Sequence, residues 1–251
     1  MDVGEVVAIA LAGLAAGAIN TVVGSGTLIT FPVLLAFGYA PVTANVSNTI
    51  GLVPGSLSGA IGYRRELAGQ GRRILRLGAA SVLGGTTGAV LLLVLPASAF
   101  KAIVPAFIAI ALVLVVIQPR LNEALAHRER GRDGEGGIAT LLGVYAAGVY
   151  GGYFGAAQGI LLLGILGVML QQDLQRTNAL KNVLAALVNG VAGIYFAIAA
   201  HVEWAPAGII AGASIVGGQI GAHYGRRLHP VVLRGVIVVV GVTAIVRLLV
   251  T

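Results

Sequence analysis

The sequence predicts an all-α integral membrane protein, built from two inverted repeats of five hydrophobic segments each. Three observations lead to this prediction. The 251 residues are 57% hydrophobic and only 10% charged, whereas soluble domains carry about 25% charged residues. Apolar segments alternate with short polar tracts along the whole chain. One longer polar linker, at 119–137, separates a first transmembrane repeat at 1–118 from a second at 138–251.

The composition excludes several classes of protein. A charge content this low is not that of a disordered chain, and a chain without cysteine is neither a disulfide scaffold nor a thiol enzyme. The formal net charge is +7, but the arginines lie in short tracts between apolar runs, as in the cytoplasmic loops of membrane proteins. We therefore expect the lipid bilayer, and not nucleic acid, to be the partner of this basic chain.

Ten apolar segments follow one another. They cover residues 5–23, 28–37, 44–63, 77–95, 100–117, 138–156, 160–170, 178–199, 206–225 and 231–249. A spanning helix needs about 20 apolar residues, so the segments at 28–37 and 160–170 reach only about half of the hydrocarbon thickness. We expect half-helices or arms of re-entrant hairpins, which are tolerated where they are buried in protein or line a cavity. Full crossings are the alternative.

The two halves resemble each other in several places and in the same order. Residues 15–24 align with residues 146–155, and a short segment follows in both halves. Further on, Asn45 and Asn48 align with Asn178 and Lys181. A last match places Ser56 opposite Asn189. Ordered matches of this kind indicate an internal repeat.

Loop charge predicts how the repeats are oriented. The loop after the third segment contains five arginines, whereas its counterpart at 200–206 has neither Lys nor Arg. The bias reverses one junction later, where 225–230 is basic and 96–101 is nearly neutral. Because basic loops stay in the cytoplasm, both termini are expected outside, the linker inside, and the repeats inverted. The membrane would be the inner (cytoplasmic) membrane of a bacterial-type cell. The five arginines are Arg64, Arg65, Arg72, Arg73 and Arg76.

Two glycine-rich interruptions, at 20–27 and 151–159, each precede a short segment. Backbone N–H groups at the start of a short helix, together with the helix dipole, favour anions. The alternative is that these glycines only permit close packing, as expected for the pairs at 13 and 17, 84 and 88, and 217 and 221. Two clusters in corresponding places favour a binding site. Its candidate residues are Asn20, Gly24, Ser25, Gly26, Thr27, Gly155 and Gln158.

Lys181 lies a few residues inside an apolar run. A lysine at the centre of a membrane helix costs about 2.5–3.5 kcal/mol on insertion scales and is a functional candidate by default. No acidic residue lies at comparable depth in a helical segment, so the lysine is available to an anion. The competing interpretation is that Lys181 snorkels to the interface near Asp173 and Arg176.

Polar side chains near Lys181 form a stripe at helical spacing. Asn178, Asn182 and Asn189 share one side of a helix with the lysine. The stripe either faces a pore or joins helices by hydrogen bonds. Asn48 is expected to flank the same region as Asn182, with Ser47 and Ser56 as secondary candidates.

The sequence contains weaker evidence for other functions. The chain has no Walker A motif and no Cys/His cluster with metal spacing, so no cofactor and no metal are expected. The string Gly24-Ser25-Gly26 is similar to the nucleophile region of intramembrane serine proteases. That chemistry needs a histidine within reach of Ser25, and the sole candidate is His223, which is otherwise a structural residue or a proton relay.

Residues 16–32, followed by Asn45, Ser47 and Asn48, resemble the sulfite exporter TauE/SafE family of membrane transporters. Residues 150–159 and 177–182 resemble the second repeat of the same family, so the resemblance covers nearly the whole chain. It implies the movement of small sulfur-containing and organic anions such as sulfite, sulfonates and sulfoacetate.

The chain departs from the family pattern at both glycine motifs. Family motifs often run Gly-x-Gly-Gly-Gly, whereas here Gly24 and Gly26 flank a serine and Gly155 is followed by Ala-Ala-Gln-Gly. The second short segment also lacks a proline matching Pro32. These departures do not affect the expected architecture. They do prevent any one substrate of the family from being transferred to this chain.

The hypothesis is a non-enzymatic carrier for a small anion, a sulfur oxyanion or organosulfonate. The anion would lie between 20–27 and 151–159, with charge from Lys181 and hydrogen bonds from Asn48, Gln158 and Asn182. One repeat would rock against the other to give alternating access. An anion channel is the alternative, and an intramembrane hydrolase using Ser25 is the less favoured one. A glycine-rich helix face could also support a homodimer.

Overall fold

The computed structural model describes residues 1–126, 137–170 and 172–224, together with positions 238, 239, 242 and 245. Within this part, the chain forms nine helices and no strand. The helices are α1 (Val3–Val22), α2 (Thr27–Ala36), α3 (Pro41–Gly62), α4 (Gly71–Val94), α5 (Ala97–Ala126), α6 (Ile138–Tyr153), α7 (Gln158–Met169), α8 (Leu174–Ala199) and α9 (Trp204–Tyr224). The all-α prediction is confirmed for this part of the chain.

The helices correspond in order to the first nine expected apolar segments. The tenth, at 231–249, lies almost entirely outside the described residues. The boundary between α5 and the linker differs from the expectation. The helix continues to Ala126, so it occupies the first part of the expected linker at 119–137, and residues 127–136 lie outside the described part.

Local sequence explains where several helices begin. Asp2 is the N-cap of α1 and accepts a hydrogen bond from the Glu5 N–H. Asp173 caps α8 in the same way through the Arg176 N–H. Pro41 occupies the first turn of α3, where its missing N–H costs nothing.

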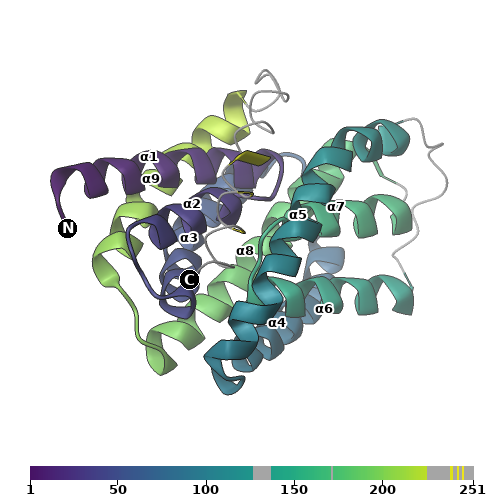
Figure 1. Ribbon diagram of the computed structural model, residues 1–251. Helices are drawn as coiled ribbons and strands as arrows, with labels where there is room; N and C mark the ends of the chain where they lie inside the picture. Colours follow the sequence, from purple (N-terminus) through teal and green to yellow (C-terminus); the bar gives the residue numbers. More distant parts are fainter. Residues whose placement is uncertain (127–136, 171, 225–237, 240–241, 243–244, 246–251) are drawn as a thin grey trace.

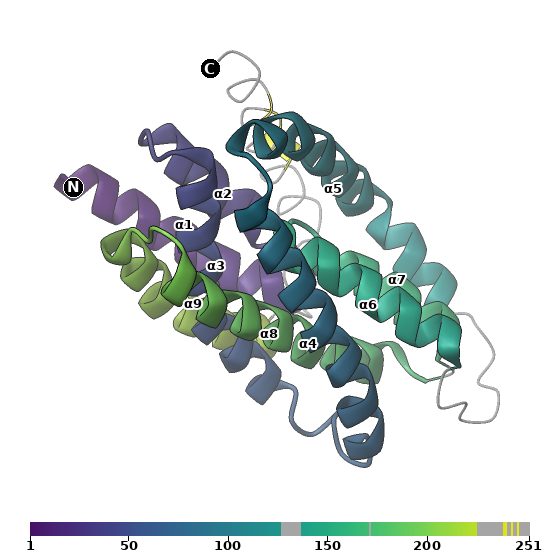
Figure 2. The ribbon, with the colours of Figure 1, turned by 90° about the horizontal axis from the view of Figure 1, so that it is seen from below.

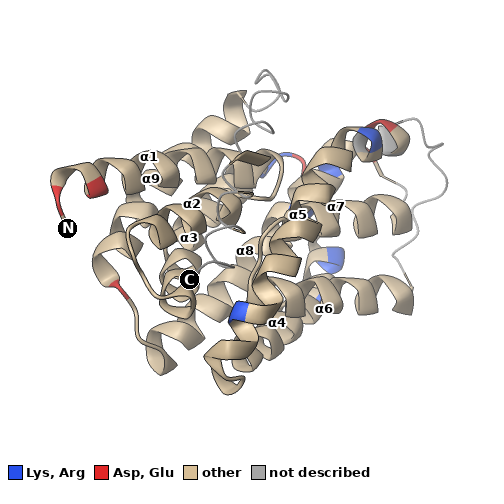
Figure 3. Cartoon of the chain, viewed as in Figure 1, with Lys and Arg blue, Asp and Glu red and all other residues tan. Residues whose placement is uncertain are grey.

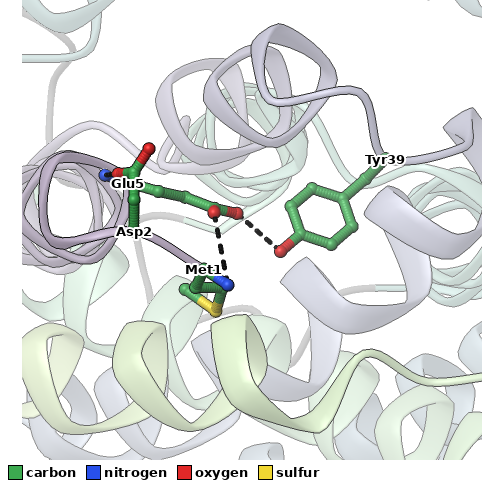
Figure 4. A network of polar contacts seen from close by, with 4 residues as sticks. All are labelled: Met1, Asp2, Glu5 and Tyr39. Carbon is green, nitrogen blue, oxygen red and sulfur yellow. Dashed lines mark hydrogen bonds and ion pairs between the residues drawn. The ribbon is translucent and has the colours of Figure 1, made fainter.

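The start of α1 is tied to the connection between α2 and α3 (Figure 4). The Tyr39 hydroxyl donates to Glu5 Oε1 at 2.7 Å, and the Met1 amino nitrogen lies 4.0 Å from Glu5 Oε2. Burial, followed by the hydrogen bond to Glu5, raises the pKa of Tyr39 to about 12. The phenol therefore stays protonated and keeps donating to the carboxylate well above neutral pH.

The helices form two groups, each containing elements from both halves of the sequence (Figures 1 and 2). In the first group, α9 packs along α1 and α3, and α2 folds back against α1. In the second, α4 packs along α6 and α8, and α7 lies against α6 and α8. The two groups meet where α3 packs on α8. The fourth helix of each half is thus exchanged to the other half.

Glycines make the closest helix contacts in both groups. A Cβ on Gly17 or Gly217 would overlap backbone atoms across the α1–α9 contact, and one on Gly84 or Gly88 would do so across the α4–α6 contact. Gly13 and Gly221 also face backbone atoms of the neighbouring helix. Small residues let membrane helices approach in this way. The expectation that these three pairs serve packing is confirmed.

Two apolar clusters fill the interior. The smaller joins α4, α6, α7 and α8 and includes Leu77, Leu162 and Leu180. The larger includes residues from all nine described helices and from both helix breaks. Within it, Phe31 of α2 makes edge contacts with Phe100 of α5 and Phe154 of the second break, with ring centroids 6.3 and 5.2 Å apart.

Five described helices are long and apolar enough to cross a membrane, namely α1, α4, α5, α8 and α9. Figure 3 shows long stretches of the helices without any charged residue, and acidic residues near the N-terminus. Large apolar side chains such as Leu11, Leu83, Val113 and Ile198 are exposed on the outer surface. In water this surface would be an aggregation liability, whereas lipid solvates it. The chain is a membrane protein with several transmembrane-capable helices.

Candidate binding site at two helix breaks

Both halves end one helix and begin a shorter one in the same way. At the first break, the Ile19 carbonyl accepts hydrogen bonds from the N–H groups of Val23 and Gly24. At the second, the Tyr150 carbonyl accepts them from Phe154 and Gly155. Gly24 and Gly155 have φ of +86° and +77°, a conformation that ends a helix and that glycine adopts without strain. The equivalent positions predicted from the aligned strings therefore have matching local geometry.

The two breaks touch each other. The Gly159 N–H, in the first turn of α7, donates to the Gly24 carbonyl at 3.1 Å. A Cβ on either glycine would overlap the Cα of the other. The two glycine-rich segments, which are far apart in the sequence, thus meet as the sequence analysis expected of a shared site.

The N-termini of α2 and α7 begin at this contact. The first described donor in α2 is the Leu28 N–H, which bonds the Ser25 carbonyl. The N–H groups of residues 25–27 have no partner in the described part of the chain. The α2 helix is 10 residues long and α7 is 12, so each brings several aligned peptide dipoles to the crossing.

Two buried side chains at the breaks lack partners. Ser25 is 0% exposed and its hydroxyl has no hydrogen bond among the described residues. Gln158 is 3% exposed and its amide nitrogen likewise has none. The Gln158 side chain lies directly against Gly151 of α6, where a Cβ would overlap it. Buried polar atoms are nearly always satisfied by protein, water or ligand, so these two donors are candidates for binding a polar occupant.

Lys181 is held at the end of α1. Its side chain is 1% exposed, and Nζ lies 3.4 Å from the Asn20 carbonyl oxygen and 3.2 Å from that of Thr21. The Asn182 amide donates to the same Thr21 oxygen at 3.2 Å. Lys181 is therefore buried in this structure, with its ammonium on helix-end carbonyls. The snorkelling interpretation does not describe this conformation.

The α3 helix contacts both breaks through two asparagines. The Asn48 amide donates to Thr27 Oγ1 at 3.4 Å, and its oxygen accepts from the Thr30 hydroxyl, so Asn48 joins α3 to the start of α2. The Asn45 amide donates to the Tyr153 carbonyl at the end of α6 at 3.1 Å. The end of α6 is thus bonded by α3, and the end of α1 is bonded by α8 through Lys181 and Asn182. In both cases the bond comes from the third helix of the opposite half.

The remaining candidates have mixed surroundings. Asn20 and Asn189 both donate to the Ser56 hydroxyl, at 3.2 and 3.0 Å, and so join α1, α8 and α3. Ser47 accepts a hydrogen bond from the Glu203 N–H at the start of α9 and has a structural role. The buried Asn178 has a side-chain oxygen without a described partner. The predicted asparagine stripe therefore divides between helix-joining contacts and one open acceptor.

Two residues at the breaks were not singled out from the sequence. Tyr153 is buried, and its hydroxyl has no described partner. Asn45 bonds the second break directly. The signal for Asn45 was its alignment with Asn178, which was a candidate residue. Nothing in the sequence distinguished Tyr153 from a packing aromatic.

The hydrolase interpretation gains no support from the described residues. A serine nucleophile requires a base within hydrogen-bonding reach, and the Ser25 hydroxyl has no partner in the described part. His223 is exposed at the last turn of α9. The His201 ring lies 3.5 Å from Glu203 and is also exposed.

The fold and this polar centre define a class: a membrane protein whose helices bury polar groups and two helix ends between them. The family model described as Sulfite exporter TauE/SafE matches residues 9–248. The chain belongs to this family of membrane transporters.

Relatives of the chain carry matching descriptions. It is 28% identical over 214 residues to the "Probable membrane transporter protein YfcA" of Escherichia coli (strain K12), covering 85% of this chain and 76% of the relative. It is 26% identical over 241 residues to the "Probable membrane transporter protein ORF9" of Sinorhizobium sp, covering 95% and 90%. A "Probable membrane transporter protein" of Haemophilus influenzae is 25% identical over 245 residues, covering 95% and 93%. No solved structure shows significant similarity to the chain.

Proposed function

We propose that this protein is a carrier for a small anion, bound where the two helix breaks cross. The observation that carries the proposal is the meeting of two helix N-termini at Gly24 and Gly159, with the buried Ser25 and Gln158 donors left unpartnered. Unpaired N–H groups and aligned helix dipoles favour negative charge. Broken helices aimed in this way at anionic groups are a feature of secondary transporters.

The cargo class comes from the family. Its description as a sulfite exporter family points to a sulfur oxyanion or organosulfonate, such as sulfite or sulfoacetate. The donors at the crossing are hydroxyl, amide and backbone N–H groups, which suit the several acceptor oxygens of such an anion. The ammonium of Lys181 adds positive charge nearby, although its described bonds are to carbonyl oxygens of α1.

Inverted repeats and alternating access are part of the same proposal. The packing of α9 on α1 and α3 is matched by that of α4 on α6 and α8, as a two-fold relation between the halves would require. The hydrogen bond between Asn189 and Ser56, which hold equivalent repeat positions, is expected near such an axis. The α2 and α7 helices span roughly 15 and 18 Å, which suits half-helices in re-entrant hairpins.

The test is uptake of labelled sulfite, thiosulfate and sulfoacetate into proteoliposomes, measured for one pair of site variants and one pair of control variants. Ser25→Ala and Gln158→Leu remove the unpartnered donors at the breaks. Each should raise KM about tenfold, since a lost hydrogen bond to a charged group is worth about 1.5 kcal/mol. Saturable uptake with this KM increase supports a carrier.

The matched controls are Ser81→Ala and Gln118→Leu. Ser81 in α4 and Gln118 in α5 are also buried, at 0% and 3% exposure, and also carry a side-chain atom without a described partner. Because neither side chain has a described hydrogen bond to the two breaks, their KM should stay within about twofold of the original protein. Equal effects in both pairs would contradict the proposed site. Uptake that does not saturate would favour a channel.

A further inference from the structure

The end of α1 carries negative partial charge that the helix itself cannot neutralise. Asn20 and Thr21 belong to its last turn, where carbonyl groups lack intrahelical donors. The aligned peptide dipoles add about half a negative elementary charge at this end. Since the end lies at the buried crossing of the two breaks, its carbonyl oxygens attract a positive group more strongly than they would in water, whereas burial costs that group its hydration.

Lys181 supplies that positive group from the opposite half of the sequence. Its Nζ bonds both carbonyls, at 3.4 and 3.2 Å, and Asn182 adds a neutral donor to one of them. The matching end of α6 receives only a neutral amide, from Asn45 to Tyr153. The first break is therefore closed by a charge and the second by a dipole, which distinguishes the two otherwise similar halves.

No acidic side chain shares this position among the described residues. Lys181 is the one charged residue among those that are buried. The α3 and α7 helices contain no titratable residue, and α6 contributes only tyrosines, of which Tyr150 and Tyr153 are at its inner end. The acid of α1, Glu5, lies 15 residues before Asn20. The charged residues of α4 and α5 lie at helix ends: Arg72, Arg73, Arg76, Lys101, Arg120 and Glu123.

We propose that the Lys181 ammonium takes the place that a bound coupling cation holds at the broken helices of other carriers, and that its proton couples anion transport to proton movement. The ammonium donates to the α1 carbonyls and holds the first break in its anion-binding shape. When Lys181 gives its proton to water, the neutral amine loses the charge-assisted part of both bonds. The end of α1 is then released.

Release at this point reaches the site directly. Gly24 follows Thr21 by three residues, and its carbonyl accepts the Gly159 N–H that joins the two breaks. A shift of the α1 end therefore moves one wall of the anion site against the other. Lys181 acts here as a positioning residue, because its described contacts are to backbone and not to the donors assigned to the anion.

The first experiment measures the α1 end without any cargo. Hydrogen exchange of residues 18–24, normalised to the intrinsic rate, is followed from about pH 6 to pH 9 in lipid nanodiscs. In the original protein, protection should fall as the pH rises, because the capping charge is lost. Lys181→Arg keeps a charge that does not titrate, so its protection should not change with pH. Protection that is constant in the original protein, or falls equally in Lys181→Arg, would overturn the proposal.

The second experiment measures coupling and rests on the proposed function. Thiosulfate is the probe, because its own charge is constant over this pH range. With the membrane potential clamped, an imposed pH gradient should change initial uptake at least tenfold in the original protein and less than twofold in Lys181→Arg. Replacing sodium by another cation should have no effect.

Asn182→Ala is the matched control for lost capping without lost charge. It should lower uptake by the same factor at every pH, because the neutral amide does not titrate. Uptake by the original protein that ignores the pH gradient would overturn the coupling. Absence of thiosulfate uptake alongside pH-dependent protection would count against the proposed cargo and still support the role of Lys181.

Discussion

Gly159 and Gly24 are required for different reasons, although they touch each other. Gly159 lies in a regular helix, so only the space beside Gly24 excludes a side chain. Gly24 is excluded from substitution by the same contact and also by its φ of +86°. In the sequence both residues are simply glycines in glycine-rich strings. Whether a glycine is required by limited space or by a positive φ depends on the folded structure.

Gly159→Ala should therefore destabilise the protein and weaken transport. The added methyl group would push the breaks apart, and overpacking of this kind costs about 1–3 kcal/mol. Gly38→Ala is the control for backbone strain alone, since Gly38 has φ of +88° with nothing within 4 Å of its Cβ position. Melting temperature and uptake measured together separate the effects. We expect Gly38→Ala to lose stability but to keep its KM.

The connection between α2 and α3 shows what a single tether contributes at the level of an element. Tyr39 joins this connection to the first turn of α1 through Glu5 (Figure 4). The same carboxylate lies near the Met1 amino group. The short helix α2 is thereby held near its C-terminal end by a polar contact, and at its N-terminal end by Asn48 and the crossing.

Tyr39→Phe should lower the free energy of unfolding by about 1 kcal/mol, the usual value of one hydrogen bond. Because the folded state raises the pKa of Tyr39 to about 12, this contribution is complete below the unfolded pKa of about 10. It is lost as the pH rises through 12. The check is an absorbance titration of tyrosine, in which the original protein minus Tyr39→Phe should show one phenol ionising near pH 12. Ionisation of that phenol near pH 10 would contradict the tether.

At the scale of the whole molecule, the exchange of α4 and α9 between the halves determines how motion can occur. Each group of helices contains three helices from one half and one from the other. In the proposed alternating access, the first group would carry α9 with it and the second would carry α4. Relative movement in this proposal would be concentrated where α3 meets α8 and where the breaks cross, a region that contains buried polar residues such as Asn48, Lys181 and Asn182.

The predicted orientation of the whole chain is testable because the sequence contains no cysteine. Arg72→Cys and Trp204→Cys place single thiols at exposed residues in the first turns of α4 and α9. Inverted repeats put these corresponding turns on opposite sides of the membrane, Arg72 inside and Trp204 outside. An impermeant maleimide applied to intact cells should label only the second variant. Labelling of both from the same side would contradict the inverted topology.

Much of the fold follows from patterns that are local in the chain. Apolar runs of helical length identify the helices, because burying polar backbone in lipid demands helices. The breaks were located from glycine strings and from short segments after them. The end of α5 was misplaced because polar residues after Pro119 resemble a linker, whereas the helix continues to Ala126. The helix propensities of the residues after Pro119 are compatible with either a helix or a linker.

The sequence by itself determined the class of protein, the helices, the two breaks and the residues worth testing, because hydropathy, glycine content and charge act at short range. Only the tertiary structure decided which groups meet. It placed Gly159 on Gly24, directed Lys181 to the carbonyls of α1, and left Ser25 and Gln158 without partners. These outcomes depend on the crossing of segments more than 100 residues apart. No periodicity within one segment encodes such a crossing, since the energy of each contact depends on where the other chain segment packs.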